Sequence, residues 1–140
     1  MKSHLIISVA LLLSACAATV EVKPISRTAT IQHVCILENP EAGDADILLL
    51  LRDGFDRNGI SSEIYKESKP ANCEYIVTYS TTYKWELLYG TYLRNAQIRI
   101  EKDGRFVATG HYHAGEGFVA SKWRGSKAAI DPVIDEMLKK

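Results

Sequence analysis

Two histidines and a glutamate late in the chain have a spacing that suits metal chemistry. His111 and His113 are separated by one residue, and Glu116 follows three positions later. Alternate residues of a β-strand point to one face, so both imidazoles would lie together there. Two imidazoles and a carboxylate can bind Zn²⁺ or Cu²⁺. The alternative is two solvated histidines on an open sheet face. Because no second histidine-rich segment accompanies them, we expect no metal and no cofactor.

Motifs for catalysis are missing from the sequence. It contains no G-x-S-x-G, no H-E-x-x-H and no P-loop. Asp44 and Asp46 are better explained as acidic residues in the first turns of a helix, where the helix dipole favours them, than as an acid–base pair. We therefore expect a protein that is not an enzyme.

The N-terminal residues have the three-part pattern of a secretory signal peptide. Lys2 gives a positive start, residues 5–13 are nonpolar apart from Ser8, and small residues follow. The nonpolar run is too short for a transmembrane helix, which needs about 20 residues.

The signal peptide ends in Leu13-Ser14-Ala15-Cys16, which resembles a bacterial lipobox. The resemblance implies cleavage before Cys16 and attachment of lipid to its thiol and its new amine. Several acyl chains on one residue would make a stable membrane anchor, since a single chain binds only marginally. Residue 17 is Ala and not the Asp that retains enteric-type lipoproteins at the inner membrane. The resemblance therefore implies the outer membrane, facing the periplasm.

Two cysteines remain once Cys16 carries lipid. Cys35 and Cys73 form an even pair in an oxidising compartment, which predicts a disulfide. The bond would close a loop of about 39 residues and contribute roughly 3–4 kcal/mol on the chain-entropy model. The alternative is two buried free thiols in strands. Neither cysteine lies in a C-x-x-C motif, which argues against redox catalysis.

Charge and length restrict the class of protein further. The chain has equal numbers of basic and acidic residues, and removal of the signal peptide takes Lys2 and leaves a net charge of about −1. No basic stripe is present, so we expect no nucleic-acid partner. We predict a signal peptide over 1–15, a lipid anchor with a flexible tether over 16–29, and one periplasmic domain over 30–140.

Hydrophobic periodicity gives the elements that would position these residues. The spacing predicts two helices, over 41–58 and from about 126 to 138, although Pro132 could delay or kink the second. Asp103-Gly104 predicts a type I′ hairpin turn. Strands are expected over 30–37, 60–65, 73–86, 91–102 and about 106–112. The order β-α-β-β-β-β-α predicts an α+β two-layer sandwich, with both helices on one face of a mostly antiparallel sheet of about five strands.

Aromatic residues divide between a predicted core and a predicted surface. Tyr79, Tyr83 and Trp85 share the nonpolar face of their strand and are expected in the core, as is Phe106. Tyr89 falls in a turn, and we expect it at the surface.

Three residues are candidates for contact with a partner. Trp123 lies in a glycine-flanked loop and Tyr89 in a turn, and Tyr and Trp are favoured at recognition surfaces. Arg94 falls on the same side of its strand as Tyr92, where it could line a cleft or extend past Tyr92 to solvent.

The lipobox and the order of elements resemble small Gram-negative outer-membrane lipoproteins of uncharacterised function. The order is also similar to the N-terminal domain of the Tol–Pal translocation protein and to auxiliary lipoproteins of envelope transport machines. The resemblance implies a non-enzymatic adaptor or assembly factor that binds another envelope protein. The alternatives are a periplasmic binder of a small ligand or metal, and an inhibitor of a cell-wall-degrading enzyme.

Overall fold

An open six-stranded sheet forms the framework of the molecule. The computed structural model describes residues 17–43 and 46–140, so the predicted signal peptide and Cys16 lie outside the described residues. The strands lie in the order β1-β6-β5-β4-β2-β3, with β2 parallel to both of its neighbours and the other pairs antiparallel. Their bounds are β1 Thr19–Lys23, β2 His33–Leu37, β3 Ser61–Tyr65, β4 Tyr75–Glu86, β5 Gly90–Lys102 and β6 Arg105–His113. This confirms the α+β class and the mostly antiparallel sheet, with six strands where about five were expected.

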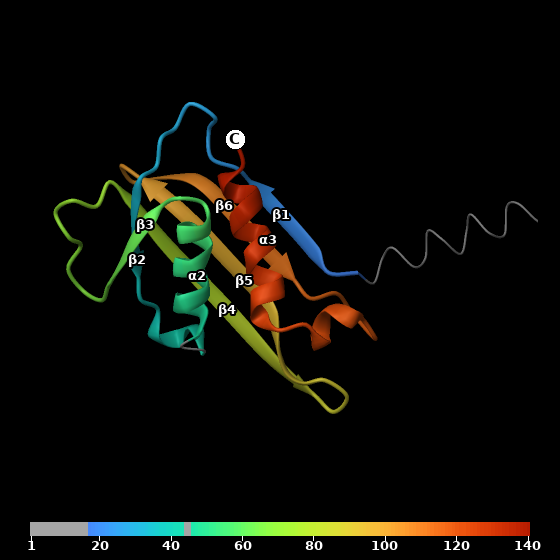
Figure 1. Ribbon diagram of the computed structural model, residues 1–140. Coiled ribbons are helices and arrows are strands. Elements are labelled where there is room, and N and C mark those ends of the chain that lie inside the picture. The colour runs from blue at the N-terminus through green and yellow to red at the C-terminus, as the bar shows by residue number, and fades with distance from the viewer. Residues whose placement is uncertain (1–16, 44–45) are drawn as a thin grey trace, which may run out of the picture.

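Two helices cover one face of this sheet, as Figure 1 shows. They are α2 (Asp46–Arg57) and α3 (Ser126–Leu138), and α3 continues through Pro132. Each turns a nonpolar face inward, including Leu51 and Phe55 from α2 and Ile134 from α3, all of which are buried. The two-layer arrangement that the sequence predicted is therefore confirmed.

Two glycines allow the layers to approach closely. A Cβ atom at Gly54 of α2 would collide with Ile134, and one at Gly110 of β6 would collide with Val133 and Met137. Close packing of this kind is sensitive to the addition of even one methylene group. A larger residue at either position would force the facing side chains of α3 to move.

The start of the first predicted helix differs in the structure. Pro40–Ala42 forms a short 3₁₀ helix, η1, and Gly43 ends it with a positive φ of 73°. The described α-helix begins only at Asp46. Asn39 caps η1 by accepting a hydrogen bond from the amide of Glu41 at 3.0 Å. This local bond competes with an α-helical start at Glu41.

The tether predicted over residues 16–29 is wrong for its central part. Residues Thr19–Lys23 form β1, which pairs with β6 so that Thr19 lies opposite His113. Further on, Ile25 is buried and its amide donates to the carbonyl of Met137 at 2.8 Å. The free edge of β6 explains the difference, since its unpaired backbone groups accept a strand of almost any sequence.

Shifts of register explain why some core predictions fail along β5 and β6. Ile100 lies opposite Ala108 but Glu101 lies opposite Phe106, so one residue of β6 is extra. An extra residue reverses the faces beyond it. Phe106 is therefore exposed and stacks under Arg99, 5.1 Å from the guanidinium to the ring centre.

The turn between these strands has the geometry that the sequence predicts. Asp103 and Gly104 both have positive φ angles, 51° and 75°. Two positive φ angles in a two-residue loop are the mark of a type I′ turn. The expected hairpin is therefore confirmed.

Candidate binding surface

Large nonpolar side chains gather where the β4–β5 hairpin projects beyond the two helices. We call this region the aromatic end. Trp85 and Leu88 are 64% and 67% exposed, which corrects the expectation that Trp85 lies in the core. By the alternation of β4, Trp85 falls on the same face as Val77, but it lies near the end of the strand, and Figure 1 shows that this part of the hairpin extends beyond α2 and α3. The aromatic end consists of Trp85, Leu87, Leu88, Tyr89, Phe118 and Trp123.

The rings of the aromatic end pack against one another from two segments. Tyr89 comes from the β4–β5 turn, and Phe118 and Trp123 come from the segment between β6 and α3. The ring centre of Tyr89 lies 4.7 Å from that of Trp123, and Phe118 lies 5.1 Å from Trp123 in an edge-on arrangement. The structure thus brings together two predicted contact residues, Tyr89 and Trp123.

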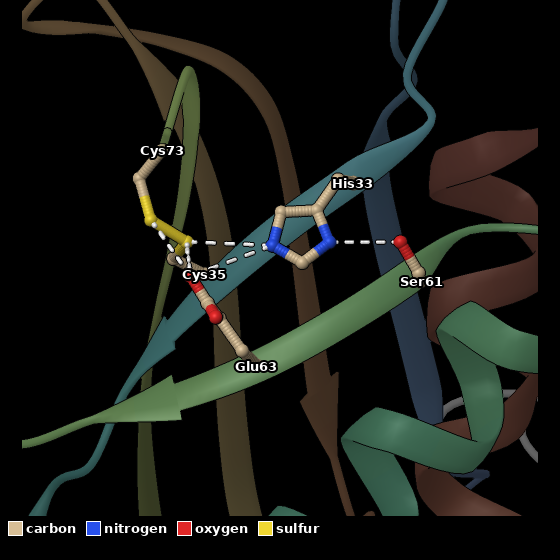
Figure 2. Close-up of a disulfide and its surroundings, with 5 residues drawn as sticks. All are labelled: His33, Cys35, Ser61, Glu63 and Cys73. Carbon is tan, nitrogen blue, oxygen red and sulfur yellow. Dashed lines mark hydrogen bonds and ion pairs between the residues drawn. A yellow bond between two sulfur atoms is a disulfide. The ribbon is translucent and has the colours of Figure 1, made fainter. Parts of the chain in front are cut away.

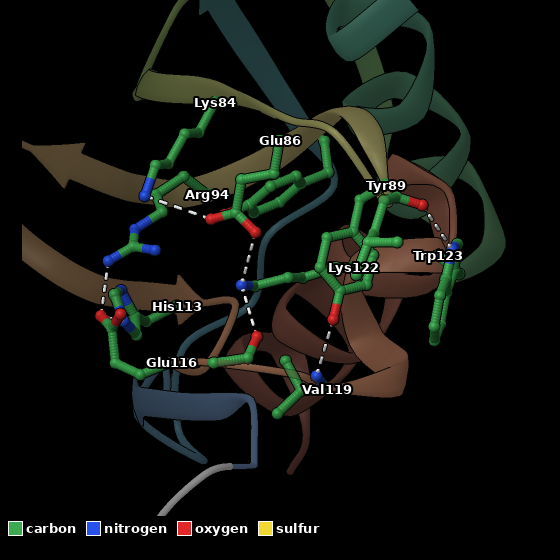
Figure 3. Close-up of polar contacts among 12 residues, drawn as sticks. Lys84, Glu86, Tyr89, Arg94, His113, Glu116, Val119, Lys122 and Trp123 are labelled. Carbon is green, nitrogen blue, oxygen red and sulfur yellow. Dashed lines mark hydrogen bonds and ion pairs between the residues drawn. The ribbon is translucent and has the colours of Figure 1, made fainter.

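Hydrogen bonds hold these rings while leaving their nonpolar surfaces outward. The indole Nε1 of Trp123 donates to the carbonyl of Leu88 at 3.3 Å. The Tyr89 hydroxyl accepts from the amide of Val119 at 3.2 Å, as Figure 3 shows. Trp123 belongs to a short 3₁₀ helix, η2 (Ala120–Trp123), which limits its freedom further. Contacts within the chain therefore hold the rings of this surface in place.

A buried lysine contacts both segments that form the aromatic end. The Lys122 side chain is only 2% exposed, and its ammonium donates to Glu86 at 3.0 Å and to the carbonyl of Gly117 at 2.6 Å (Figure 3). The same ammonium lies 4.9 Å from the ring centre of Tyr89 and 5.2 Å from that of Tyr92. A cation over aromatic faces is attracted by their negative quadrupole. Lys122 therefore joins the hairpin to the segment that carries Phe118 and Trp123.

Glu86 is the acceptor at the centre of these contacts. Its carboxylate accepts from the Tyr92 hydroxyl at 2.8 Å and from Lys122, and it pairs with Lys84 at 3.1 Å. The hydrogen bond from Tyr92, followed by the one from Lys122, lowers the pKa of Glu86 from 4.5 to about 2. Glu86 therefore stays ionised well into the acid range.

The third predicted contact residue, Arg94, lies in a neighbouring polar cluster. Leu93 pairs with Tyr83 and Asn95 pairs with Thr82, so Arg94 is the extra residue of a bulge. Its guanidinium donates to Glu116 at 2.5 Å. The bulge also turns Tyr92 away from the helix-covered face, toward Glu86 and Lys122.

Two of the predicted metal candidates share that cluster. His113 lies 3.3 Å from Glu116 through Nε2, and its Nδ1 lies 2.6 Å from the side-chain oxygen of Asn95. Burial raises the pKa of Glu116, but Arg94 and His113 outweigh this and lower it overall. The carboxylate thus already has a cationic partner. His111 is exposed on the sheet face, opposite Gln97.

Glu86, Lys122 and the pair Leu87-Leu88 were not predicted as parts of the site. One signal was present, because turns normally consist of Gly, Asn, Asp, Pro or Ser, and this one contains two leucines. A nonpolar turn is hard to explain by folding alone. The Glu86–Lys122 contact joins residues 36 positions apart, and no local pattern could indicate it.

The chain was compared with known proteins and structures. No family model and no curated protein matches it. Its fold is similar to that of the dodecamer of a PelC point variant from Paraburkholderia phytofirmans, with a TM-score of 0.61 and 14% identity over 88% of this chain and 99% of that one. The PelC dodecamer from the same organism in another crystal form has a TM-score of 0.60 and 16% identity, again over 88% of this chain and 99% of that one. Identity at this level establishes a shared fold only.

A more distant solved structure is a PDZ domain protein from Parabacteroides distasonis, with a TM-score of 0.43 and 9% identity over 91% of this chain and 38% of that one. Within the described residues, no helix has the length and nonpolar character needed to cross a membrane.

Proposed function

We propose that this protein is a non-enzymatic outer-membrane lipoprotein that binds another envelope protein through its aromatic end. The observation that carries the proposal is the exposure of Phe118 and Trp123, packed with Tyr89 beside the β4–β5 turn, together with the exposure of Trp85, Leu87 and Leu88 in the same hairpin end. Contiguous exposed nonpolar patches mark interaction sites on soluble domains. Trp and Tyr anchors supply much of the binding energy at such interfaces.

The charged support of the surface favours a binding role over an accident of folding. Lys122 is buried beside Glu86 and two aromatic rings, and it lies in the same segment as Phe118 and Trp123. Burying an ammonium carries a large desolvation penalty. A segment that had only to connect β6 to α3 could do so without it.

The position of β1 restricts where the partner lies. Thr19 of β1 pairs with His113 of β6, which in turn pairs with Asn95 of β5. Asn95 is close to the start of β5 at Gly90, where the aromatic end lies. Cys16 precedes Thr19 by three residues, which span at most about 11 Å. A lipid on Cys16 would therefore hold this end of the sheet close to the membrane. The partner we propose is accordingly an outer-membrane protein, reached along the membrane surface.

A second copy of the same chain is the other candidate partner. The two PelC structures of similar fold are described as dodecamers. In that case the aromatic end would be an interface between subunits, and the anchors of all subunits would lie at one membrane. The same surface residues would be buried in both cases.

Site-specific photo-cross-linking in intact cells of the host tests the proposal. A cross-linking amino acid replaces Leu88 in the full-length anchored protein, and the control replaces Leu49, a leucine of α2 that is 55% exposed. We expect one dominant envelope protein linked from position 88 and not from position 49. Links between copies would favour the second candidate. Links to lipid alone from position 88 would contradict both.

The anchor has its own test. Labelling with radioactive palmitate should mark the wild-type protein and should be lost in Cys16→Ser. If the label remains in Cys16→Ser, the lipidation site is wrong, while the binding surface would still be judged by the cross-linking result.

A further inference from the structure

The Cys35–Cys73 disulfide that the sequence predicted lies among other groups that can bind metal. The sulfur of Cys35 is 3.2 Å from Oε1 of Glu63 and 3.7 Å from Nε2 of His33. The sulfur of Cys73 is 3.6 Å from the same Glu63 oxygen (Figure 2). Within the described part of the chain, His33, Cys35 and Glu63 form the cluster whose ligand atoms all lie within 4.8 Å of one another.

The sheet topology creates this cluster. His33 and Cys35 are alternate residues of β2 and therefore point to the same face. Glu63 of β3 is the direct partner of Cys35 in the parallel register. Cys73 comes just before β4, which flanks β2 on its other side. β2 and β3 thus place an imidazole, a sulfur and a carboxylate together, and the residues before β4 bring the Cys73 sulfur to the same carboxylate.

The hydrogen bonds around His33 leave a lone pair directed at the sulfurs. Ser61 donates its hydroxyl proton to the carbonyl of Gln32 at 3.1 Å, because a carbonyl can only accept. The Ser61 oxygen, 2.8 Å from Nδ1 of His33, therefore accepts the Nδ1 proton. In the neutral imidazole, Nε2 then carries no proton and faces Cys35 and Glu63. Metal-binding histidines are held by the same kind of contact through their other nitrogen.

The Glu63 carboxylate, whose side chain is 40% exposed, receives no hydrogen bond from the disulfide beside it. A disulfide sulfur has no proton to donate, so neither nearby sulfur can satisfy the carboxylate oxygen. Nε2 of His33 lies 3.6 Å from the carboxylate and, in the tautomer described above, has no proton to donate to it either. Two thiols, or a cation bound between them, would supply what the oxidised state does not.

We propose that His33, Cys35, Glu63 and Cys73 form a redox-gated site for Zn²⁺, closed by the disulfide and opened by a dithiol reductant. Reduction transfers two electrons and two protons, so that the dithiol becomes a disulfide and the Cys35–Cys73 bond becomes two thiols. Binding of Zn²⁺ then releases both thiol protons to solvent and forms two zinc–sulfur bonds. His33 and Glu63 complete four ligands.

Four of the donor separations are close to those around a tetrahedral zinc ion. Ordinary zinc–ligand bond lengths place donor atoms about 3.3–3.8 Å apart. Of the five separations other than the S–S bond, four are 3.2, 3.6, 3.6 and 3.7 Å. The fifth joins Cys73 to His33, and Cys73 is not part of the group whose ligand atoms lie within 4.8 Å, so its sulfur would have to approach the imidazole. The two sulfurs must move apart, and the Cα separation of 5.8 Å allows this by side-chain rotation. Two thiolates, an imidazole and a carboxylate are ligands that zinc accepts.

Titration with Co²⁺, a spectroscopic substitute for Zn²⁺, tests the site in the purified full-length protein. One sample is left oxidised. Another is reduced with dithiothreitol, which is then removed under anaerobic conditions. We expect one equivalent of Co²⁺ to bind the reduced protein, with thiolate-to-cobalt charge-transfer absorption and strong visible bands, and none to bind the oxidised protein. Zn²⁺ should displace the cobalt and should protect both thiols from alkylation.

Variants separate the four-ligand site from a simple dithiol. Reduced His33→Asn and Glu63→Gln should each bind at least tenfold more weakly. His111→Asn, which changes a histidine elsewhere on the sheet, should bind as the wild type does. Equal binding by all of these proteins would overturn the proposal, since the thiols alone would then hold the metal. Absence of charge-transfer absorption in the reduced wild type would also overturn it. So would a reduced protein that unfolds, by circular dichroism, and is not restored by Zn²⁺.

Discussion

The β4–β5 hairpin has two halves that are stabilised in different ways. In the near half, Val77, Ile98 and Ile100 are fully buried under the helices. In the far half, which comprises residues 83–93, Trp85, Leu87 and Leu88 are exposed, and Glu86 and Lys122 hold the hairpin to the following segment. The same pair of strands thus relies on nonpolar burial at one end and, at the other, adds charged contacts to the burial of Tyr92 and Leu93. The charged contacts leave nonpolar side chains of the far half exposed, as the proposed binding role requires.

The largest effect should come from the near half. Ile98→Ala removes a fully buried side chain beneath the helices and should lower the free energy of unfolding by about 2–5 kcal/mol. Urea unfolding, followed by far-ultraviolet circular dichroism, measures this. A loss below about 1 kcal/mol would mean that the near half does not carry the stability of the fold.

A smaller loss of stability should follow from Lys122→Met. This change leaves Glu86 and the carbonyl of Gly117 without their ammonium donor. Lys84→Met is the matched control, because Lys84 also pairs with Glu86 but has a side chain that is 52% exposed. We expect the urea midpoint to fall for Lys122→Met and to change little for Lys84→Met. Equal midpoints for the two variants would contradict the supporting role of the buried lysine.

The far half should become less stable as the pH falls from 4.5 toward 2. Because the pKa of Glu86 is lowered from 4.5 to about 2, its contribution to stability is complete above pH 4.5 and is lost as the pH falls toward about 2. Both tryptophans of the chain, Trp85 and Trp123, belong to the aromatic end, so their fluorescence reports on this region. Between pH 4.5 and 2, the change in tryptophan fluorescence should be smaller in Glu86→Gln than in the wild type. It should be the same as in the wild type for Glu67→Gln, which alters an exposed loop carboxyl. Identical titrations would exclude Glu86 as the group responsible.

The smallest effect on folding should come from the surface itself. Leu88→Ser changes a side chain that is mostly exposed, so its free energy of unfolding should differ from the wild type by less than about 0.5 kcal/mol. Urea unfolding beside Leu49→Ser measures the difference. A loss as large as that of Ile98→Ala would show that Leu88 belongs to the core.

Much of the fold was predictable because it depends on local patterns. The nonpolar spacing of α3 and the Asp103-Gly104 turn gave the expected bounds and geometry. What the sequence did not indicate depends on contacts between distant segments. The pairing of β1 with β6 and the bulge at Arg94 are set by strand neighbours and not by local composition.

The candidate site was predictable only in part. Tyr89 and Trp123 were identified by their residue types and loop positions, and the structure places their rings in contact. The buried Lys122 was missed because a lysine in a polar loop is normally solvated. The four groups around the Cys35–Cys73 bond were missed for a related reason, since His33 and Glu63 meet only through the parallel pairing of β2 and β3.

The most direct test of the binding surface measures partner recovery and stability in the same variants. Cross-linked envelope complexes are purified from cells that express the anchored wild type, Leu88→Ser or Leu49→Ser, and urea midpoints are recorded for each protein. We predict that Leu88→Ser recovers at least tenfold less of the dominant partner with an unchanged midpoint, while Leu49→Ser matches the wild type in both. Equal recovery of the partner by all three proteins would contradict the assignment of the aromatic end as the binding surface.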